Sequence, residues 1–164
     1  MQLVILIAKK QLKFILVQLV IIRLNLIIDF VGIADNLSKS RNIKKKRGMP
    51  VRYIIAGSRN FQNYSLMEKT LNSLNLGPDD EIVSGDARGA DTLGAEYGTR
   101  HKIPVIHFPA QWDTYGKAAG FIRNEEMAEY GDYLVAFWDG KSRGTAHMIQ
   151  AMKRKGKHGK VVFI

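Results

Sequence analysis

Apolar and polar positions after residue 48 follow two alternating patterns, short apolar runs and longer amphipathic stretches. The short runs predict strands, because a few consecutive apolar residues bounded by glycine, proline or polar residues are typical of a buried strand. The predicted strands cover residues 51–56, 81–84, 103–107, 132–137 and 160–164. Strands that alternate with helices indicate a parallel sheet with helices on both faces.

The stretches between these runs carry apolar residues at helical spacing. Four residues that lie three or four apart share one helical face in the first stretch: Tyr64, Met67, Leu71 and Leu74. Three more helices are predicted, over about 90–100, over about 117–130 and from near Thr145.

The order of the strands follows from chain direction and from one proline. Pro104 begins the third run, and a proline suits a strand beginning or a sheet edge because it donates no ladder hydrogen bond. Right-handed crossovers make all five strands parallel and bring the turns that follow them to one edge. We therefore predict a three-layer α/β sandwich with strand order 3-2-1-4-5 and a ligand site at the switch point between the first and fourth strands. Gly94 and Gly98 in the second helix would let its backbone approach the sheet closely.

Three of the strand-to-helix turns are rich in glycine, serine and arginine. They are Gly57-Ser58-Arg59, the segment from Gly85 to Asp91 and the segment from Asp139 to Thr145. A turn that opens a helix presents free backbone N–H groups, and the helix dipole favours an anion there. The recurrence predicts a phosphate-bearing ligand, and a plain solvated turn is the alternative for each segment.

The candidate binding residues lie on these turns and on the third predicted helix. Asp91 could accept a hydrogen bond from a ribose hydroxyl, or its negative charge could merely interact favourably with the helix dipole. Arg123 interrupts an apolar stripe, so we expect it to face something other than bulk water. Trp112, Tyr115 and Trp138 lie beside the turns and could stack on a base or belong to the core. The full candidate set is Gly57, Ser58, Arg59, Ser84, Gly85, Arg88, Gly89, Ala90, Asp91, Arg123, Asn124, Asp139, Ser142, Arg143, Gly144 and Thr145.

The charge of the chain is unevenly distributed. The 164 residues include 25 lysines and arginines and 15 aspartates and glutamates, which gives a formal net charge of +10. Ten of the basic residues but only two of the acidic ones precede residue 49, so the remainder carries a net charge of +2. The net charge of residues 49–164 is therefore nearly neutral and does not indicate binding of nucleic acid.

Several classes of site are excluded or disfavoured by composition and motif. The absence of cysteine excludes a disulfide scaffold, thiol catalysis and any cysteine-ligated metal site. The four histidines lack the spacing of a zinc site, so we expect no metal. The sequence has neither the G-x-G-x-x-G fingerprint of an ordinary NAD dehydrogenase nor the Walker A lysine-serine pattern.

Residues 1–48 form an N-terminal extension that is apolar at first and basic at its end. Five charged residues interrupt its apolar part, and the longest uncharged stretch, Phe14 to Ile22, falls short of the about 20 residues that span a bilayer. No small-x-small cleavage site follows it. We expect the domain to cover 49–164, preceded by an over-extended reading frame or a poorly ordered appendage. A weak signal anchor with Lys44 to Arg47 at the membrane surface is the alternative.

A set of segments resembles one known superfamily. In chain order they are Ile54 to Phe61, Ile82 to Gly85 with Gly89 to Asp91, Phe108 to Ala110 with Trp112, Ala118 to Gly120 with Arg123-Asn124, and Ala136 to Gly140 with Ser142 to Thr145. They resemble the SLOG superfamily, specifically its YspA-type (cpYpsA-related) branch of Rossmann-like domains found in bacteria and phages. The resemblance covers nearly all of 50–164 and implies a nucleotide or nucleotide-derived ligand, such as an ADP-ribose or NAD-derived molecule, bound over the turns in a sensing role.

The same superfamily includes cytokinin-activating phosphoribohydrolases, which leaves an enzyme as an alternative. These hydrolases have a P-G-G-x-G-T-x-x-E turn whose glutamate takes part in N-glycosidic cleavage. Aligning Gly144-Thr145 with the G-T of that turn puts Met148 where the glutamate should be. A thioether cannot act as an acid or base, so Asp139 or Asp91 would have to be the catalytic residue.

The sequence favours binding of a nucleotide in sensing or signalling. The first alternative is a nucleoside-monophosphate phosphoribohydrolase, with Arg123 orienting the phosphate. The second is a DprA-like DNA-binding or membrane-tethered module, attached through residues 1–48. We expect a cytoplasmic protein that binds a small nucleotide, with no nucleic acid on its core and a membrane contact only if residues 1–48 insert; assembly into a homo-oligomer stays open.

Overall fold

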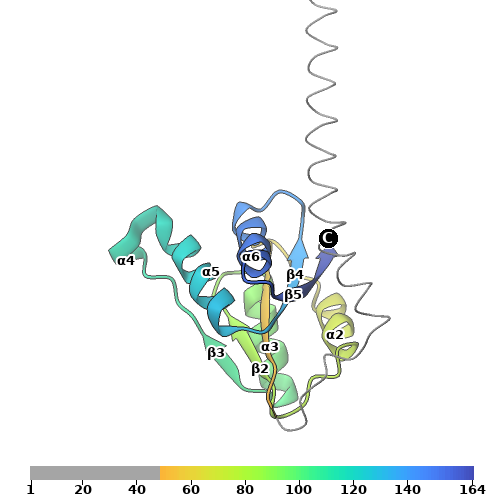
Figure 1. Cartoon of the computed structure of the whole chain (residues 1–164). Helices are drawn as coiled ribbons and strands as arrows, with labels where there is room; N and C mark the ends of the chain where they lie inside the picture. Colours follow the sequence, from red (N-terminus) through yellow and green to blue (C-terminus); the bar gives the residue numbers. More distant parts are fainter. Residues whose placement is uncertain (1–48) are drawn as a thin grey trace, which may run out of the picture.

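A five-stranded parallel sheet runs through residues 49–164, the part of the chain that the computed structural model describes (Figure 1). Its strands are β1 (Arg52–Gly57), β2 (Glu81–Ser84), β3 (Val105–His107), β4 (Tyr133–Trp138) and β5 (His158–Phe163). Their order in the sheet is β3-β2-β1-β4-β5, as predicted. The proposed anchor and basic leader of residues 1–48 lie outside the described residues.

The edge position of β3 agrees with the prediction from Pro104. Its carbonyl accepts from the N–H of Ile82 at 2.8 Å, so this proline contributes an acceptor where it lacks a donor. β3 itself starts one residue later and has three residues. β5 forms the other edge and begins at His158, opposite Tyr133 of β4, two residues before the predicted start.

Five helices and one 3₁₀ turn connect the described strands. They are α2 (Tyr64–Asn72), α3 (Ala90–His101), α4 (Trp112–Tyr115), η1 (Gly116–Ala118), α5 (Ala119–Tyr130) and α6 (Arg143–Arg154). α5, with the end of η1, confirms the helix predicted over about 117–130, and Gly116, with a φ of +49°, separates it from the short helix α4, which the sequence analysis did not predict. α6 starts earlier than predicted, because the hydroxyl of Ser142 caps it by accepting from the N–H of Thr145. Within residues 49–164 no helix has the length and apolarity that a bilayer crossing needs.

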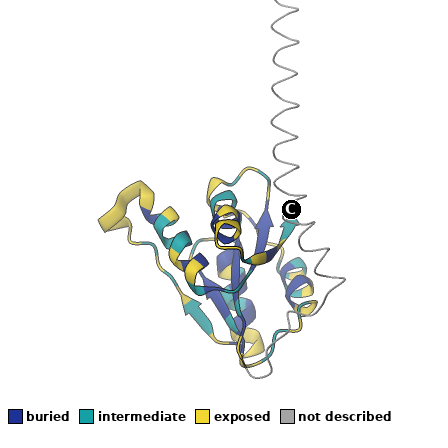
Figure 2. Cartoon of the chain, in the orientation of Figure 1, coloured by how far each residue is buried: buried dark blue, intermediate teal, exposed yellow. Residues whose placement is uncertain are grey.

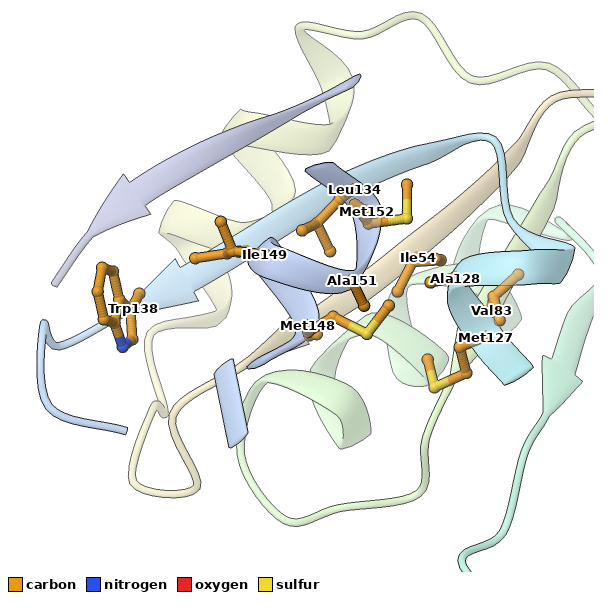
Figure 3. Packing of buried hydrophobic residues seen from close by; sticks show 12 residues of the cluster. Ile54, Val83, Met127, Ala128, Leu134, Trp138, Met148, Ile149, Ala151 and Met152 are labelled. Carbon is orange, nitrogen blue, oxygen red and sulfur yellow. The ribbon is translucent and has the colours of Figure 1, made fainter. Parts of the chain in front are cut away.

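Alternate residues of each central strand pack against opposite helix layers. In β1, Tyr53 and Ile55 belong to the core cluster with α2 and α3, whereas Ile54 and Ala56 belong to the cluster with α5 and α6. Figure 2 shows the central strands mostly dark blue between the two layers, with the edge strand β3 teal, and Figure 3 shows the second cluster, in which methionines of α5 and α6 cover the strands. This two-sided burial explains why the strands read as continuous apolar runs.

Gly94 and Gly98 bring α3 close to the sheet, as the sequence predicted. A Cβ atom at Gly94 would lie 2.6 Å from Cγ2 of Ile55, and one at Gly98 would lie 2.5 Å from Cγ2 of Val105. Both distances are shorter than van der Waals contact, so only glycine fits without a shift of helix or strand.

Replacing Gly94 by alanine is therefore expected to destabilise the fold. The Gly94→Ala variant should lose about 1–3 kcal/mol of free energy of unfolding, the usual cost of overpacking a core, in chemical denaturation. Gly144→Ala is the matched control, because a Cβ there meets nothing within 4 Å and alanine favours a helix. Equal stability of the two variants would contradict the close packing of α3.

Candidate functional site

A cavity of about 420 Å³ lies between the turns that follow β1 and β4, the helix α5 and the start of α6. Its position is the switch point of the sheet, since β1 and β4 are neighbours whose crossovers run in opposite directions. The volume falls within the range of about 300–1,000 Å³ that is typical of small-molecule sites.

Eleven of the predicted binding residues line this cavity. They are Gly57, Ser58, Arg59, Asp91, Arg123, Asn124, Asp139, Ser142, Arg143, Gly144 and Thr145. They come from turns and helices up to 88 positions apart in the chain, and the predicted convergence of the first and last turns is confirmed.

The other five predicted residues belong to the turn after β2 and lie outside the lining. Gly85 accepts a hydrogen bond from Arg123, and the hydroxyl of the buried Ser84 donates to the carbonyl of Asp91 at 3.3 Å. Gly89 precedes α3 with a φ of +84°, and Ala90 lies against Gly57. These residues position α3, whereas Arg88 is exposed. Their part in ligand binding stays a prediction.

Gly57 and Ser58 join the turn after β1 to the turn after β4. A Cβ at Gly57 would lie 2.3 Å from the carbonyl oxygen of Phe137, so the close approach requires glycine. The N–H of Ser58 donates to that same oxygen at 2.9 Å, and its hydroxyl accepts from the N–H of Asp139 at 3.2 Å. The buried Ser58 hydroxyl thus fixes the relative position of the two turns.

Asp139 shapes the turn after β4. One carboxylate oxygen accepts from the N–H of Lys141 at 2.9 Å and from the N–H of Ser142 at 2.8 Å. These two backbone hydrogen bonds lower the pKa of Asp139, which therefore stays ionised at neutral pH. A permanently ionised carboxylate is a poor general acid, and the structure gives Asp139 a role in loop geometry.

The start of α6 presents unsatisfied donors to the cavity. Among residues 49–164, no acceptor pairs with the backbone N–H of Arg143 or of Gly144. The side chains of Arg59, Lys117 and Arg143 also line the cavity, and none of them forms a hydrogen bond or ion pair with another described residue. Uncompensated donors and cations at a helix N-terminus are the requirements of an anion site.

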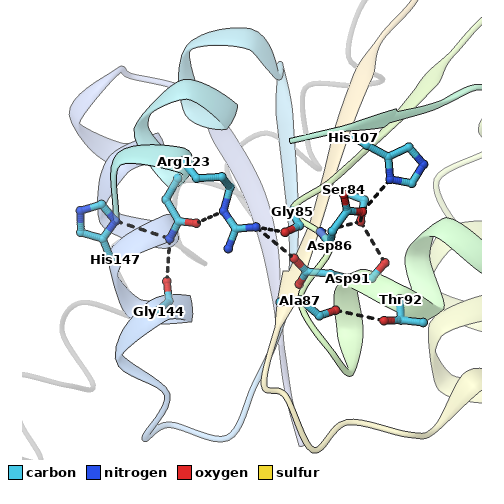
Figure 4. Close-up of polar contacts among 11 residues, drawn as sticks. Ser84, Gly85, Asp86, Ala87, Asp91, Thr92, His107, Arg123, Gly144 and His147 are labelled. Carbon is cyan, nitrogen blue, oxygen red and sulfur yellow. Dashed lines mark hydrogen bonds and ion pairs between the residues drawn. The ribbon is translucent and has the colours of Figure 1, made fainter. Parts of the chain in front are cut away.

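The side chain of Arg123 extends from α5 to the turn after β2. Its side chain is only 12% exposed. Nη1 donates to the carbonyl of Gly85 and lies 4.0 Å from a carboxylate oxygen of Asp91 (Figure 4). The prediction that this arginine faces something other than bulk water is confirmed.

Asp91 is the most perturbed carboxyl group in the cavity. Burial raises its pKa to about 6, although the nearby Arg123 guanidinium and hydrogen bonds from the backbone of Ala87 and Gly85 oppose this rise. Burial also lowers the pKa of Arg123. Loss of solvation therefore outweighs attraction for the Asp91 carboxyl and the Arg123 guanidinium, as it often does in buried ion pairs.

Asn124 connects α5 to the start of α6. The buried amide of this residue donates to the carbonyl of Gly144 at 3.0 Å and lies 3.5 Å from Nδ1 of His147 (Figure 4). The hydrogen bond to Gly144 orients the first turn of α6, so Asn124 positions the free N–H groups described above.

Two aromatic residues and a lysine from the segment 112–121 complete the lining. Trp112 and Phe121 are 52% and 43% exposed, respectively, and both line the cavity together with Lys117. Trp138 is buried and its Nε1 donates to the carbonyl of Ser142, whereas Tyr115 lies outside the lining. Sequence reasoning missed Lys117 and Phe121; the one available signal is the placement of Phe121 outside the apolar stripe of its helix. Within the described part of the chain, no cluster of three histidine or carboxylate side chains could bind a metal.

The raised pKa of Asp91 predicts a pH-dependent contribution to stability. Between its ordinary pKa of 3.8 and about 6, the folded protein keeps a proton that the unfolded chain has lost, so this contribution is present below about pH 4 and is lost as the pH rises through about 6. The free energy of unfolding of the wild type, relative to Asp91→Asn, should therefore fall by about 2–3 kcal/mol from pH 4 to pH 7. Chemical denaturation of both proteins across this range measures the difference, and a constant difference would contradict the raised pKa.

Comparisons with known proteins agree with this geometry. Residues 51–115 match the model of the YspA, cpYpsA-related SLOG family, which confirms the resemblance over that segment. The Gene 61 protein of Mycobacterium phage D29 is 38% identical over 82 residues, which are 46% of this chain and 65% of the phage protein. The X-ray structure of DNA processing protein A (DprA) from Streptococcus pneumoniae matches 69% of this chain and 50% of its own, with a TM-score of 0.56 and 18% identity. The chain thus matches less than two thirds of either protein, and the DprA likeness shows the Rossmann-like fold alone.

Proposed function

Because residues 51–115 carry the YspA, cpYpsA-related SLOG signature, we propose that the cavity binds a nucleotide or nucleotide-derived ligand, with its phosphate at the start of α6. The observation that carries this proposal is the pair of N–H groups of Arg143 and Gly144, which have no acceptor among residues 49–164, in a cavity lined by three cations that have no hydrogen bond or ion pair within the same range. The role would be sensing or signalling.

The charges around the cavity favour an anion. Arg123 is balanced by Asp91, and the charge of Asp139 is compensated by two backbone N–H groups. Arg59, Lys117 and Arg143 then supply an excess of positive charge around the cavity, and Arg143 lies at the positive end of the α6 dipole. Arginine can bind phosphate oxygens through two parallel hydrogen bonds, which adds geometric specificity.

The arrangement gives better support to binding than to catalysis. Met148 lines the cavity at the position that aligns with the glutamate of the phosphoribohydrolases, and it is 1% exposed. The carboxylate of Asp139 accepts two hydrogen bonds from the backbone of its own turn. Of the described carboxylates that line the cavity, Asp91 alone keeps a pKa near neutrality, and it is paired with Arg123.

Removing the Arg143 guanidinium is expected to weaken binding of phosphate-bearing ligands. Isothermal titration calorimetry of the full chain with nucleoside monophosphates, ADP-ribose and NAD identifies the best ligand. Its affinity should then fall about 10- to 100-fold in Arg143→Ala, because hydrogen bonds to charged groups contribute about 1.5–3 kcal/mol.

Arg100→Ala is the matched control for this experiment. Arg100 lies in the last turn of α3, outside the cavity lining, and its removal deletes the same charge. The affinity of Arg100→Ala for the best ligand should equal that of the wild type. Absence of binding by the wild type at millimolar ligand, or equal losses in both variants, would overturn the proposed phosphate site.

A second candidate function is hydrolysis of the N-glycosidic bond of a nucleoside monophosphate. The observation in its favour is the pKa of Asp91, which burial raises to about 6 and thereby into the range of a general acid or base at neutral pH. Arg123 would then orient the phosphate or the developing charge near Asp91.

This candidate predicts that the protein releases adenine from AMP. Chromatography of the reaction mixture should show free base, and Asp91→Asn should abolish its release because an amide cannot exchange a proton. Asp139→Asn should retain part of the activity, since its role is to shape the turn. No adenine from the wild type would eliminate hydrolysis and leave ligand binding as the function, whereas an active Asp91→Asn variant would exclude Asp91 as the catalytic residue.

A further inference from the structure

We infer that Trp112 and Phe121 form the base-binding end of the cavity, while the phosphate binds at the start of α6. This inference rests on the proposed binding of a nucleotide and adds the orientation of the ligand. The nucleobase would stack on the aromatic pair, the phosphate would bind at Arg143 and Gly144, and the ribose would lie between them.

The two aromatic residues belong to a helical arm that extends from the body of the domain. The arm consists of α4, η1 and the first turn of α5, and α4 lies at its outer end (Figure 1). Its outer part is exposed, as the yellow ribbon in Figure 2 shows. Large apolar side chains are usually covered in a folded domain, so exposed ones that line a cavity indicate a surface for a ligand.

Trp112 lies against the backbone of α5. A Cβ atom at Gly120 would lie 3.3 Å from Cη2 of Trp112, so the indole ring passes close to a position without a side chain. The contact with Gly120 supports one side of the ring, while the side chain as a whole stays 52% exposed. A supported ring with a free surface is preorganised for stacking.

The ring of Phe121 is supported by a contact with α6. Its ring lies 4.7 Å from the His147 ring of α6, at an interplanar angle of 58°. Since His147 is also 3.5 Å from the Asn124 amide that binds Gly144, the aromatic end and the phosphate end share one set of contacts. The Phe121 ring is therefore held next to α6, whereas the Trp112 ring lies against Gly120 of α5.

The cavity lining offers both kinds of group that a nucleotide needs. Arg59, Arg143 and the N–H groups of α6 supply charge and donors, whereas Trp112 and Phe121 of the arm supply planar apolar surface. Every nucleobase has a π-face, so stacking on aromatic side chains tolerates differences between bases. The specificity of such a site would come from polar groups at the base edge, among which Lys117 is the nearest in sequence.

The test compares ligands with and without a base. The four nucleoside monophosphates and ribose 5-phosphate are titrated calorimetrically into the full-length wild type and into Trp112→Ala and Phe121→Ala. Each variant should bind the best monophosphate about 5- to 150-fold more weakly, the range that base–aromatic stacking provides. The affinity for ribose 5-phosphate should stay within about twofold.

Tyr115→Ala is the matched control, and Trp112→Phe tests rescue. Tyr115 belongs to the same short helix as Trp112 and is 45% exposed, but it does not line the cavity. Replacing Tyr115 should change neither the affinity for the monophosphate nor the affinity for ribose 5-phosphate. Phenylalanine at position 112 should restore most of the monophosphate affinity, and unchanged thermal unfolding of all variants shows that the fold is intact.

Tryptophan fluorescence supplies a direct second readout. The chain has two tryptophans, and Trp138 is buried, so the exposed Trp112 should report the ligand. The monophosphate should quench the emission, ribose 5-phosphate should not, and Trp112→Phe should remove the quenching.

The outcomes separate this inference from the function on which it rests. Failure of the wild type to bind any monophosphate or ribose 5-phosphate would overturn both. Monophosphate binding that Trp112→Ala and Phe121→Ala leave unchanged, without quenching, would overturn the base-binding end alone. Equal losses for the monophosphate and ribose 5-phosphate would also overturn it, because the arm would then act on the phosphate end.

Discussion

The pairing of β1 with β4 at their carboxyl ends is the constraint on which the site depends. Gly57 allows the two strands to approach at Phe137, and the N–H and hydroxyl of Ser58 then bond to Phe137 and Asp139. Asp139 in turn fixes the loop that leads to Ser142, the cap of α6. The position of the α6 N-terminus, where we propose that an anion binds, therefore depends on the contact of β1 with β4 at the switch point of the sheet.

The contact of Arg123 with Gly85 and Asp91 joins the second half of the chain to the turn after β2. It links α5, on one face of the sheet, with the start of α3, on the other. Burial shifts the pKa of Arg123 downward and that of Asp91 upward, so the pair does not stabilise the fold through simple attraction. The pair lines the cavity, so the proposed ligand would meet both groups.

The sequence was sufficient for the sheet order and for most of the cavity, because those features depend on local signals. Pro104 marked an edge strand, and the glycine-rich turns marked the strands whose ends meet. The break at Gly116 and the arm beyond it depend on a positive φ that the helical pattern did not indicate. Phe121 was missed for a related reason: its exposure is set by how the arm leaves the body, which is a tertiary property.

The hydrogen bonds of Ser58 have a consequence for how related proteins can diverge. Because they join the loops after β1 and β4 atom to atom, an insertion or deletion in either loop would separate donors from acceptors. The connection between β3 and α5 has no such contact at Gly116, where an added side chain would meet nothing within 4 Å. Length variation among homologues should therefore accumulate in that connection, while the geometry of the two loops joined by Ser58 is inherited unchanged.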